Sequence, residues 1–514
     1  MRQAALHARL AAAIGAVTTL AVLGAAPGLD PPAPPIAEAT PSPTRAVLDA
    51  ALADSPLRDN LRYLCDVIGG RPTGSPALER AVDWAVEAFR SAGVDRVSAE
   101  AFEMPLRWEE GETRLRALAP ADFPLRAVSM AWSPATPPGG LAAPLLDGGR
   151  GTAAELTSLG ERARGALLLI QQDEMRSLDD LFAEYIGNPA VLERAAAAGA
   201  AGVLFSSTRP RALLYRHQQS FGRLAPLPSA LVAREDALRL GRLVAAGPEV
   251  RVRLEMPNRI GGPFVARNVV AEWKGSERAE EIVLIGAHLD SWDLGTGALD
   301  NGGNSAMIID IARALAAAGQ RPRRSIRFVL FTGEEQGLIG SRAYVRDHRA
   351  ELDNTVAVVI FDLGVARVRG YFLGGRPELG PVLQEVLAPL AAWDVGTHPP
   401  DAFAGTDHFD FLLEGIPTLV ADQDPTSYLP DYHAVSDTFD KVDARELRLQ
   451  TVVAAMTVWG LADRPARPAA RLDAAGVAAI VRDHGLKVQM QAFGMWDDYA
   501  AGRRGLRPPD GAIP

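Results

Sequence analysis

Apolar strands that alternate with a helix constrain the fold of this chain more than any other feature. Four apolar runs have the length of strands: residues 282–286, 326–332, 355–361 and 416–421. Residues 302–318 carry apolar side chains at helical spacing, and Pro417 favours a strand end or an edge strand for the last run. Uninterrupted apolar strands that alternate with helices predict an α/β fold, with a mainly parallel sheet flanked by helices.

Polar side chains that can bind a metal follow these strands. They are His288, Asp290, Asp300, Glu334, Glu335, Asp362 and His433. In an open parallel sheet, ligands bind at the carboxyl ends of the strands. We therefore expect these side chains to converge at one edge of the sheet, although they lie far apart in the sequence.

The residue types in this set point to zinc. Two imidazoles and three or four carboxylates are donors that zinc favours. Five protein ligands, with one carboxylate shared, would hold two metal ions about 3.5–4 Å apart. One acidic residue then remains to take a proton from the bridging water. The sequence therefore indicates metal-assisted hydrolysis.

Five sequence blocks carry a resemblance to a known family. They are GAHLDSWD (286–293), GALDNG (297–302), TGEEQG (332–337), GTD (405–407) and HAVSDT (433–438). In this order and spacing they resemble the co-catalytic di-zinc exopeptidases, which include bacterial aminopeptidases and plasma glutamate carboxypeptidase (carboxypeptidase Q). The resemblance runs from about residue 50 to 462 and is closest to the carboxypeptidase Q branch. It implies the zinc exopeptidase fold with a smaller inserted domain that is protease-associated-like.

The resemblance implies two Zn²⁺ per chain and assigns their ligands. His288, Asp300 and Asp362 would hold one ion. Asp300, Glu335 and His433 would hold the other, so that Asp300 bridges the two. The segment 361–364 departs from the Glu-x-Asp that some relatives show, which makes Asp362 the ligand that the family pattern supports least.

Three further residues receive catalytic roles from the same resemblance. Glu334 would be the general base towards a metal-bridging hydroxide. Asp290 would accept the other N–H of His288, as carboxylates behind metal-bound histidines do. Tyr428 would supply a phenol that assists the reaction, or would only pack in its loop. The family also often has a cis peptide bond after the bridging aspartate, here Asp300-Asn301.

These observations predict a zinc-dependent exopeptidase, an aminopeptidase or a dipeptidase, acting on a peptide substrate near a free terminus. One alternative on the same scaffold is a single-zinc acyltransferase like glutaminyl cyclase, but that enzyme lacks the histidine equivalent to His288. The other alternative is a non-catalytic binding protein, which would be expected to have lost ligands. Asp407 either lines the substrate pocket or forms a turn. Free-terminus recognition is not visible in the sequence.

The N-terminus has the features of a secretory signal peptide over residues 1–26. Arg2 and Arg9 are basic, an apolar stretch follows, and small residues precede Pro27. The apolar stretch is shorter than the ~20 residues of a membrane span, so we expect no stable membrane anchor. The expected location is secreted or periplasmic after cleavage.

Composition changes along the chain suggest domain boundaries. We expect a Pro-rich linker over 27–44, a catalytic domain over 45–110 and 263–465, an inserted non-catalytic domain over 111–262, and a C-terminal extension over 466–514. In the inserted domain, residues 165–170 and 201–205 predict strands and 192–198 a helix. The C-terminal extension predicts one short helix and a polar tail.

Charge and cysteine content exclude some partners. The formal net charge of −10 argues against a nucleic-acid partner, which requires a basic face. Cys65 is the single cysteine, so the chain forms no internal disulfide. Relatives of the carboxypeptidase Q branch form dimers, so the resemblance favours a homodimer.

Overall fold

The computed structural model describes residues 42–218, 223–509 and 511–512. The expected signal peptide (1–26) and most of the expected linker (27–44) lie outside the described residues. The first helix, α1 (Pro43–Leu52), already begins at the end of the expected linker, where the side chain of Ser42 accepts a hydrogen bond from the backbone of Arg45.

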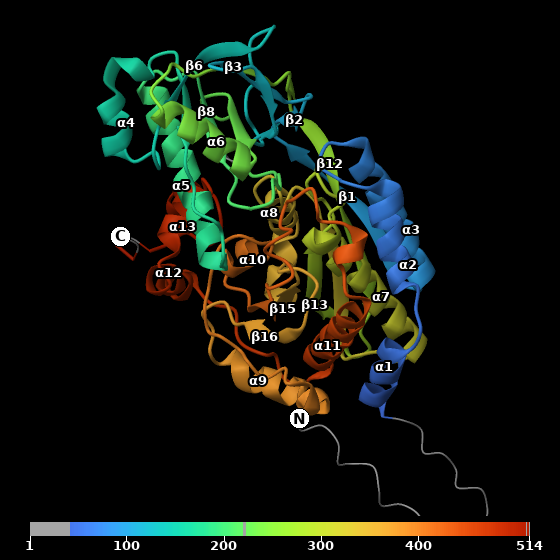
Figure 1. Cartoon of the computed structure of the whole chain (residues 1–514). Helices are drawn as coiled ribbons and strands as arrows, with labels where there is room; N and C mark the ends of the chain where they lie inside the picture. Colours follow the sequence, from blue (N-terminus) through green and yellow to red (C-terminus); the bar gives the residue numbers. More distant parts are fainter. Residues whose placement is uncertain (1–41, 219–222, 510, 513–514) are drawn as a thin grey trace, which may run out of the picture. The chain divides into compact units, whose positions relative to one another are not determined.

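A seven-stranded sheet forms the centre of the predicted catalytic region (Figure 1). Its strands, in spatial order, are β1 (Arg96–Met104), β12 (Phe264–Trp273), β14 (Arg324–Phe331), β13 (Arg278–His288), β15 (Thr355–Ile360), β17 (Thr418–Gln423) and β16 (Val368–Phe372). The inner strands β14, β13, β15 and β17 run parallel, while β1, β12 and β16 pair antiparallel. The sheet is therefore parallel where the predicted apolar runs lie and antiparallel towards both edges.

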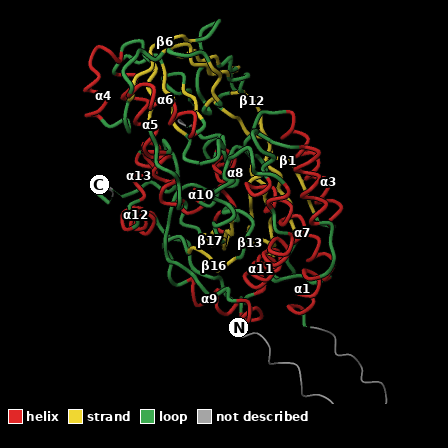
Figure 2. The backbone as a smooth tube through the Cα atoms, viewed as in Figure 1, coloured by secondary structure: helices red, strands yellow, loops and turns green. Residues whose placement is uncertain are grey.

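Helices cover both faces of this sheet (Figure 2). On one face lie α1, α2 (Leu57–Arg62), α3 (Pro76–Ala92), α7 (Gly303–Ala318), α9 (Leu379–Val386) and α11 (Ala444–Asp463). On the other face lie α8 (Ile339–Asp347) and α10 (Phe409–Leu413). Strands that are buried on both faces explain the unbroken apolar runs in the sequence.

Short helical segments connect these elements. The π-helical turns are η1 (Tyr63–Ile68) and η3 (Ala298–Gly302), and the 3-10 helices of this region are η4 (Arg349–Asn354), η5 (Ala388–Trp393) and η6 (Phe439–Lys441). Of these, η3 matters most, because it leads directly into α7 and carries Asp300.

A second sheet of eight strands lies within residues 114–255. In spatial order these are β4 (Phe123–Leu125), β3 (Arg114–Ala119), β10 (Arg251–Glu255), β6 (Leu141–Asp147), β7 (Leu167–Ile170), β8 (Gly202–Ser206), β9 (Ser229–Val232) and β5 (Ala127–Ser129). Its helices are α4 (Ala153–Leu159), η2 (Gly160–Ala163), α5 (Leu178–Ala197) and α6 (Arg234–Ala245). The expected strands are β7 and β8, and the expected helix is the end of α5. The boundaries of an inserted domain stay a prediction.

The two chain passages that flank the second sheet pair with each other. Strand β2 (Arg107–Glu109) runs antiparallel to β11 (Arg259–Gly261) in a ribbon of its own. Residues that are distant in sequence therefore leave and re-enter the catalytic region side by side.

The C-terminal extension contains more structure than its sequence suggested. Instead of one short helix it forms α12 (Ala474–Asp483), α13 (Leu486–Ala492) and α14 (Trp496–Ala500). Gly485 and Gly494 adopt left-handed backbone conformations that separate these helices. Helices this short gain their stability from packing, which local sequence patterns do not reveal.

Among the described residues, no helix is both long enough and apolar enough to span a membrane.

Candidate metal centre and active site

The sheet brings the predicted ligands to one edge. His288 is the last residue of β13, and Asp362 follows β15. Glu334 and Glu335 follow β14 after a turn at Gly333, whose φ is 74°. Because these strands are parallel neighbours, their carboxyl ends meet at one edge. His433 reaches the same place from the loop after β17, and Asp300 reaches it from η3.

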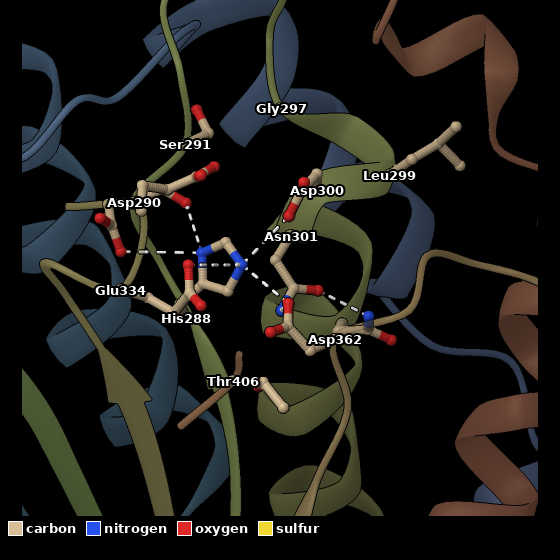
Figure 3. Close-up of polar contacts among 12 residues, drawn as sticks. His288, Asp290, Ser291, Gly297, Leu299, Asp300, Asn301, Glu334, Asp362 and Thr406 are labelled. Carbon is tan, nitrogen blue, oxygen red and sulfur yellow. Dashed lines mark hydrogen bonds and ion pairs between the residues drawn. The ribbon is translucent and has the colours of Figure 1, made fainter. Parts of the chain in front are cut away.

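His288 lies against two carboxylates. Its Nε2 atom is 2.8 Å from Asp362 Oδ1 and 3.1 Å from Asp300 Oδ1. Figure 3 shows this nitrogen directed at Asp300 and Asp362, while Nδ1 faces Asp290. The side chain of Asn301 donates a hydrogen bond to Asp362 Oδ1 (2.9 Å), which fixes that carboxylate. The three buried side chains form one candidate set of ligands.

His433 forms a second set with the same aspartate. Its Nε2 atom is 2.9 Å from Glu335 Oε2 and 3.3 Å from Asp300 Oδ2. The other ring nitrogen, Nδ1, lies 2.9 Å from the backbone oxygen of Arg216. Glu335 Oε1 is buried and has no hydrogen-bond partner among the described residues. Asp300 therefore faces each histidine with a different carboxylate oxygen.

The donor set fits zinc. Within each group of three, one ligand atom per residue lies within 4.8 Å of the others. Imidazole nitrogen and carboxylate oxygen are zinc donors, and a buried carboxylate oxygen without a partner is the kind of atom that a metal ion satisfies. The residues present could thus hold two ions that share Asp300.

Electrostatics of the cluster favour a bound cation. Burial, together with the nearby carboxylates, raises the pKa of Glu334 well above its usual value and that of Glu335 to about 7. Although burial opposes it, the charge of Glu335 raises the pKa of His433 to about 9. Against the effect of burial, hydrogen bonds from His288 and His433 lower the pKa of Asp300. So many acidic groups in one buried site repel each other unless positive charge is present.

Known proteins are similar to this chain in sequence and in fold. Residues 268–458 match Peptidase family M28. Carboxypeptidase Q of Bos taurus is 29% identical over 413 residues, covering 79% of this chain and 85% of that protein. Human carboxypeptidase Q is 28% identical over 416 residues, with the same shares.

Two solved structures are also similar to this chain. A Peptidase M28 precursor from Shewanella amazonensis SB2B is 29% identical, covers 82% of this chain and 97% of its own, and has a TM-score of 0.74. A zinc aminopeptidase from Bacillus subtilis, at 21% identity and a TM-score of 0.63, covers 80% of this chain and 96% of its own, and shares the fold. These similarities support the co-catalytic zinc exopeptidase family and confirm the resemblance and the α/β fold predicted from the sequence. The chain is a zinc metallopeptidase.

Two residues that sequence reasoning missed hold the Asp300 loop of this peptidase. The Asp437 carboxylate accepts backbone hydrogen bonds from Ala298 and Leu299 on Oδ1 (3.0 and 2.7 Å) and from Asp300 on Oδ2 (3.1 Å). The buried guanidinium of Arg71 donates to the backbone oxygens of Leu289, Thr296 and Gly297 (2.8, 2.7 and 3.0 Å). The HAVSDT block contained Asp437, but its sequence carried no sign of this contact. Arg71 was visible only as part of a turn.

Asp290 lies beside the His288 ring, but the shorter contact is made by its backbone. The backbone oxygen of Asp290 is 2.9 Å from His288 Nδ1, whereas its Oδ1 atom is 3.7 Å away. The other carboxylate oxygen, Oδ2, accepts hydrogen bonds from Thr73 Oγ1 (2.9 Å) and Gly333 N (3.0 Å). Asp290 thus ties the ends of β13 and β14 together. Its role behind His288 stays a prediction.

Tyrosines surround the second set of ligands. Tyr428 is buried, and its hydroxyl donates to Asp300 Oδ2 (3.0 Å). Tyr432 stacks on the His433 ring with 3.7 Å between ring centroids, and its hydroxyl is 2.7 Å from that of Tyr185 on α5. Sequence reasoning considered Tyr428 but not the other two. The adjacency of Tyr432 to His433 was the one available signal.

A pocket opens beside the ligand cluster of the peptidase. Glu334, with its side chain 11% exposed, and the five proposed ligand residues line it. Apolar and aromatic side chains line it as well, namely Leu181, Phe182 and Tyr185 of α5 and Phe493 of the C-terminal extension. No Arg or Lys occurs among the described residues that line this pocket. Asp407 is buried but does not line it.

Proposed function

We propose that the protein is a two-zinc aminopeptidase that hydrolyses the peptide bond next to a free amino terminus. One observation carries this proposal. Asp300 directs Oδ1 towards the ligand set of His288 and Oδ2 towards that of His433. A carboxylate shared in this way suits a pair of metal ions, whereas a single-zinc enzyme would not require the second set.

The proposed ligands are those that the family resemblance implies. His288, Asp300 and Asp362 would hold one zinc ion, and Asp300, Glu335 and His433 the other. When bound, two zinc ions supply Lewis acidity towards the peptide carbonyl and lower the pKa of a bound water towards about 7.

Glu334 is the proposed general base. It belongs to neither ligand set, yet it lies on the pocket wall, with Oε2 at 3.9 Å from His288 Nε2. A carboxylate in this place can take a proton from the attacking water and deliver it to the leaving amine. Tyr428 is proposed to orient Asp300 through its hydroxyl.

The charge of the pocket supports recognition of an amino terminus. A substrate carboxylate would be recognised best by a cationic side chain, as in a bidentate arginine contact. The described pocket lining contains no arginine or lysine, and its carboxylates are the proposed zinc ligands and base. The proposal of an amino terminus therefore rests on the lack of a cationic partner for a substrate carboxylate among the described lining residues.

We also propose how the chain is processed and organised. Residues 1–26 would direct export and be cleaved, giving a secreted or periplasmic enzyme. The catalytic domain would comprise 45–110 and 263–465, with 111–262 inserted. Formation of a homodimer is also proposed.

Metal content and peptide hydrolysis, measured on one purified sample, test this function. We expect about two zinc ions per chain and hydrolysis that is lost on chelation and restored by zinc. N-acetylation of a tripeptide should abolish cleavage, whereas C-terminal amidation should not. Cleavage that requires a free carboxylate instead would indicate a carboxypeptidase or dipeptidase. One zinc ion without hydrolysis would favour the cyclase, and absence of metal would favour a binding protein.

A further inference from the structure

The C-terminal extension, to which the sequence assigned no role, reaches the substrate pocket. We propose that its residues Phe493 and Met495, together with α5, select peptides whose amino-terminal residue has a large apolar side chain. This inference rests on the proposed aminopeptidase function and adds the substrate class and the residues that determine it.

The extension is firmly attached to the catalytic region. Buried Arg504 donates two hydrogen bonds to the buried carboxylate of Asp410 on α10 (2.8 and 2.6 Å). Gln489 Oε1 of α13 accepts a hydrogen bond from the backbone of Ala404 (2.7 Å). A buried ion pair with two parallel hydrogen bonds holds its partners in one geometry. The extension is therefore part of the pocket structure and is not a loose tail.

Its apolar side chains form a common core with α5. Phe493 is 7% exposed and Met495 is 1% exposed, and both belong to one cluster with Leu181 and Tyr185. The rings of Phe493 and Tyr185 meet edge to face, with 5.9 Å between centroids. Such packing fixes the positions of the rings. One rigid apolar wall thus faces the pocket from two segments that lie far apart in sequence.

The same pocket holds the reacting groups. Glu334 and the proposed zinc ligands line it together with the apolar wall. A peptide whose scissile bond lies at these groups places the side chain of its first residue within reach of the apolar wall. An aliphatic or aromatic side chain gains free energy by leaving water for this wall, whereas a charged side chain would lose its hydration without a partner.

The amino-terminal selectivity of the wild-type enzyme and of wall variants tests the inference. The substrates are X-Ala-Ala tripeptides with X as Leu, Phe, Gly, Glu or Lys, and the measurement is kcat/KM. We expect Leu and Phe to be preferred over Gly, Glu and Lys by tenfold or more, because each methylene in an apolar pocket discriminates about 10-fold or more. In Phe493→Ala and Met495→Ala, the Leu/Gly ratio should fall about tenfold.

The matched control is Val488→Ala, because Val488 lies on α13 of the same extension but is 55% exposed. It should keep the Leu/Gly ratio within twofold of wild type. If Phe493→Ala fails to fold, Phe493→Leu is the second variant, because it keeps an apolar wall. It should lower kcat/KM for Phe-Ala-Ala relative to kcat/KM for Leu-Ala-Ala. Each comparison uses the ratio of the kcat/KM values of two substrates, so a lower concentration of folded enzyme affects both values equally and cancels.

The possible outcomes separate this inference from the proposed function. Hydrolysis with a preference for Glu or Lys, or with an unchanged Leu/Gly ratio in Met495→Ala and both Phe493 variants, would overturn the selectivity but leave the peptidase. Absence of hydrolysis in the zinc-loaded wild type would overturn both.

Discussion

Glu334 and Glu335 are adjacent in sequence but face different partners. Glu335 lies 2.9 Å from His433 Nε2 and belongs to a ligand set, while Glu334 belongs to none. Both side chains leave the turn that follows Gly333, and each reaches a different histidine. One pair of identical residues can therefore supply both a metal ligand and a base.

Replacement of the proposed base should separate catalysis from metal binding. We expect Glu334→Gln to retain about two zinc ions and to lower kcat by about 10²–10⁴-fold, the usual contribution of general-base catalysis. Metal analysis and steady-state kinetics on the same sample measure both quantities. Glu280→Gln, at an exposed position, should match wild type. Wild-type turnover in Glu334→Gln would remove Glu334 from the mechanism.

At the scale of elements, the segment around Arg216 connects the second sheet to a proposed metal ligand. The backbone of Arg216 donates to the oxygen of His433 (2.9 Å) and accepts from its ring. His433 has a φ of 56°, an uncommon conformation that its neighbours must hold. The buried Arg216 side chain forms ion pairs with Glu110 and Asp293.

Loss of this arginine should affect both folding and one metal site. Arg216→Ala leaves two carboxylates without their partner, so we expect the free energy of unfolding to fall by about 3–5 kcal/mol. Alanine keeps the backbone contacts with His433 but loses the ion pairs that hold this backbone in place. We therefore also expect the affinity for the zinc ion bound by His433 to fall about 10–100-fold, as seen for residues that orient metal ligands. Urea unfolding and zinc titration measure these effects. Equal weakening of both ions would contradict a contact specific to His433.

A contact between α8 and β1 should make stability depend on pH. His348, at the end of α8, places Nε2 2.8 Å from Glu100 Oε2 on β1. This hydrogen bond raises the pKa of His348 above its usual value of 6.5. Since the folded state binds the proton more tightly, the stabilisation is complete below pH 6.5 and is lost as pH rises through the folded-state pKa.

The variant His348→Gln should therefore cost more stability at pH 5.5 than at pH 9. The difference should be about 1–2 kcal/mol, the size of a hydrogen bond between charged groups. Unfolding in urea at both pH values measures it. A cost that is the same at both values would mean that His348 acts only through its stacking on Tyr344, 4.1 Å between ring centroids.

At the scale of the whole molecule, the site joins segments from nearly the whole described chain. Arg71 lies before β1, Tyr185 lies on α5, His433 follows β17, and Phe493 belongs to the C-terminal extension. A metal ion held by the proposed ligands would lie among these segments. Its binding should thus stabilise the entire fold and not only the local loops.

Zinc should raise the thermal unfolding temperature of the metal-free protein. Binding only to the folded state adds about 2.7 kcal/mol when free zinc is 100-fold above its Kd. Removal of zinc also leaves the buried carboxylates in mutual repulsion. Calorimetry with and without zinc measures the shift. Asp300→Ala, which removes the shared ligand, should bind less zinc and show a smaller increase, and an unchanged increase would contradict a shared role for Asp300.

The central strands and the residue types of the candidate ligands could be predicted from the sequence, and the family resemblance divided these residues into two sets. Apolar runs such as 282–286 are a local property of the chain, since a strand buried on both faces has no polar position. The ligand types are equally local, because His288 or Glu335 carries its chemistry wherever it lies. The carboxyl ends of parallel strands then bring these residues together by a general rule.

The surroundings of this cluster depend on tertiary contacts that the sequence did not predict. Asp437 holds the Asp300 loop through backbone hydrogen bonds that no side-chain pattern encodes. Tyr185 and Phe493 reach the pocket because α5 and the C-terminal helices pack on each other. Each of these contacts joins residues that are far apart in sequence, and its free energy arises only when both segments are folded. A sequence pattern therefore does not distinguish such residues from ordinary core residues.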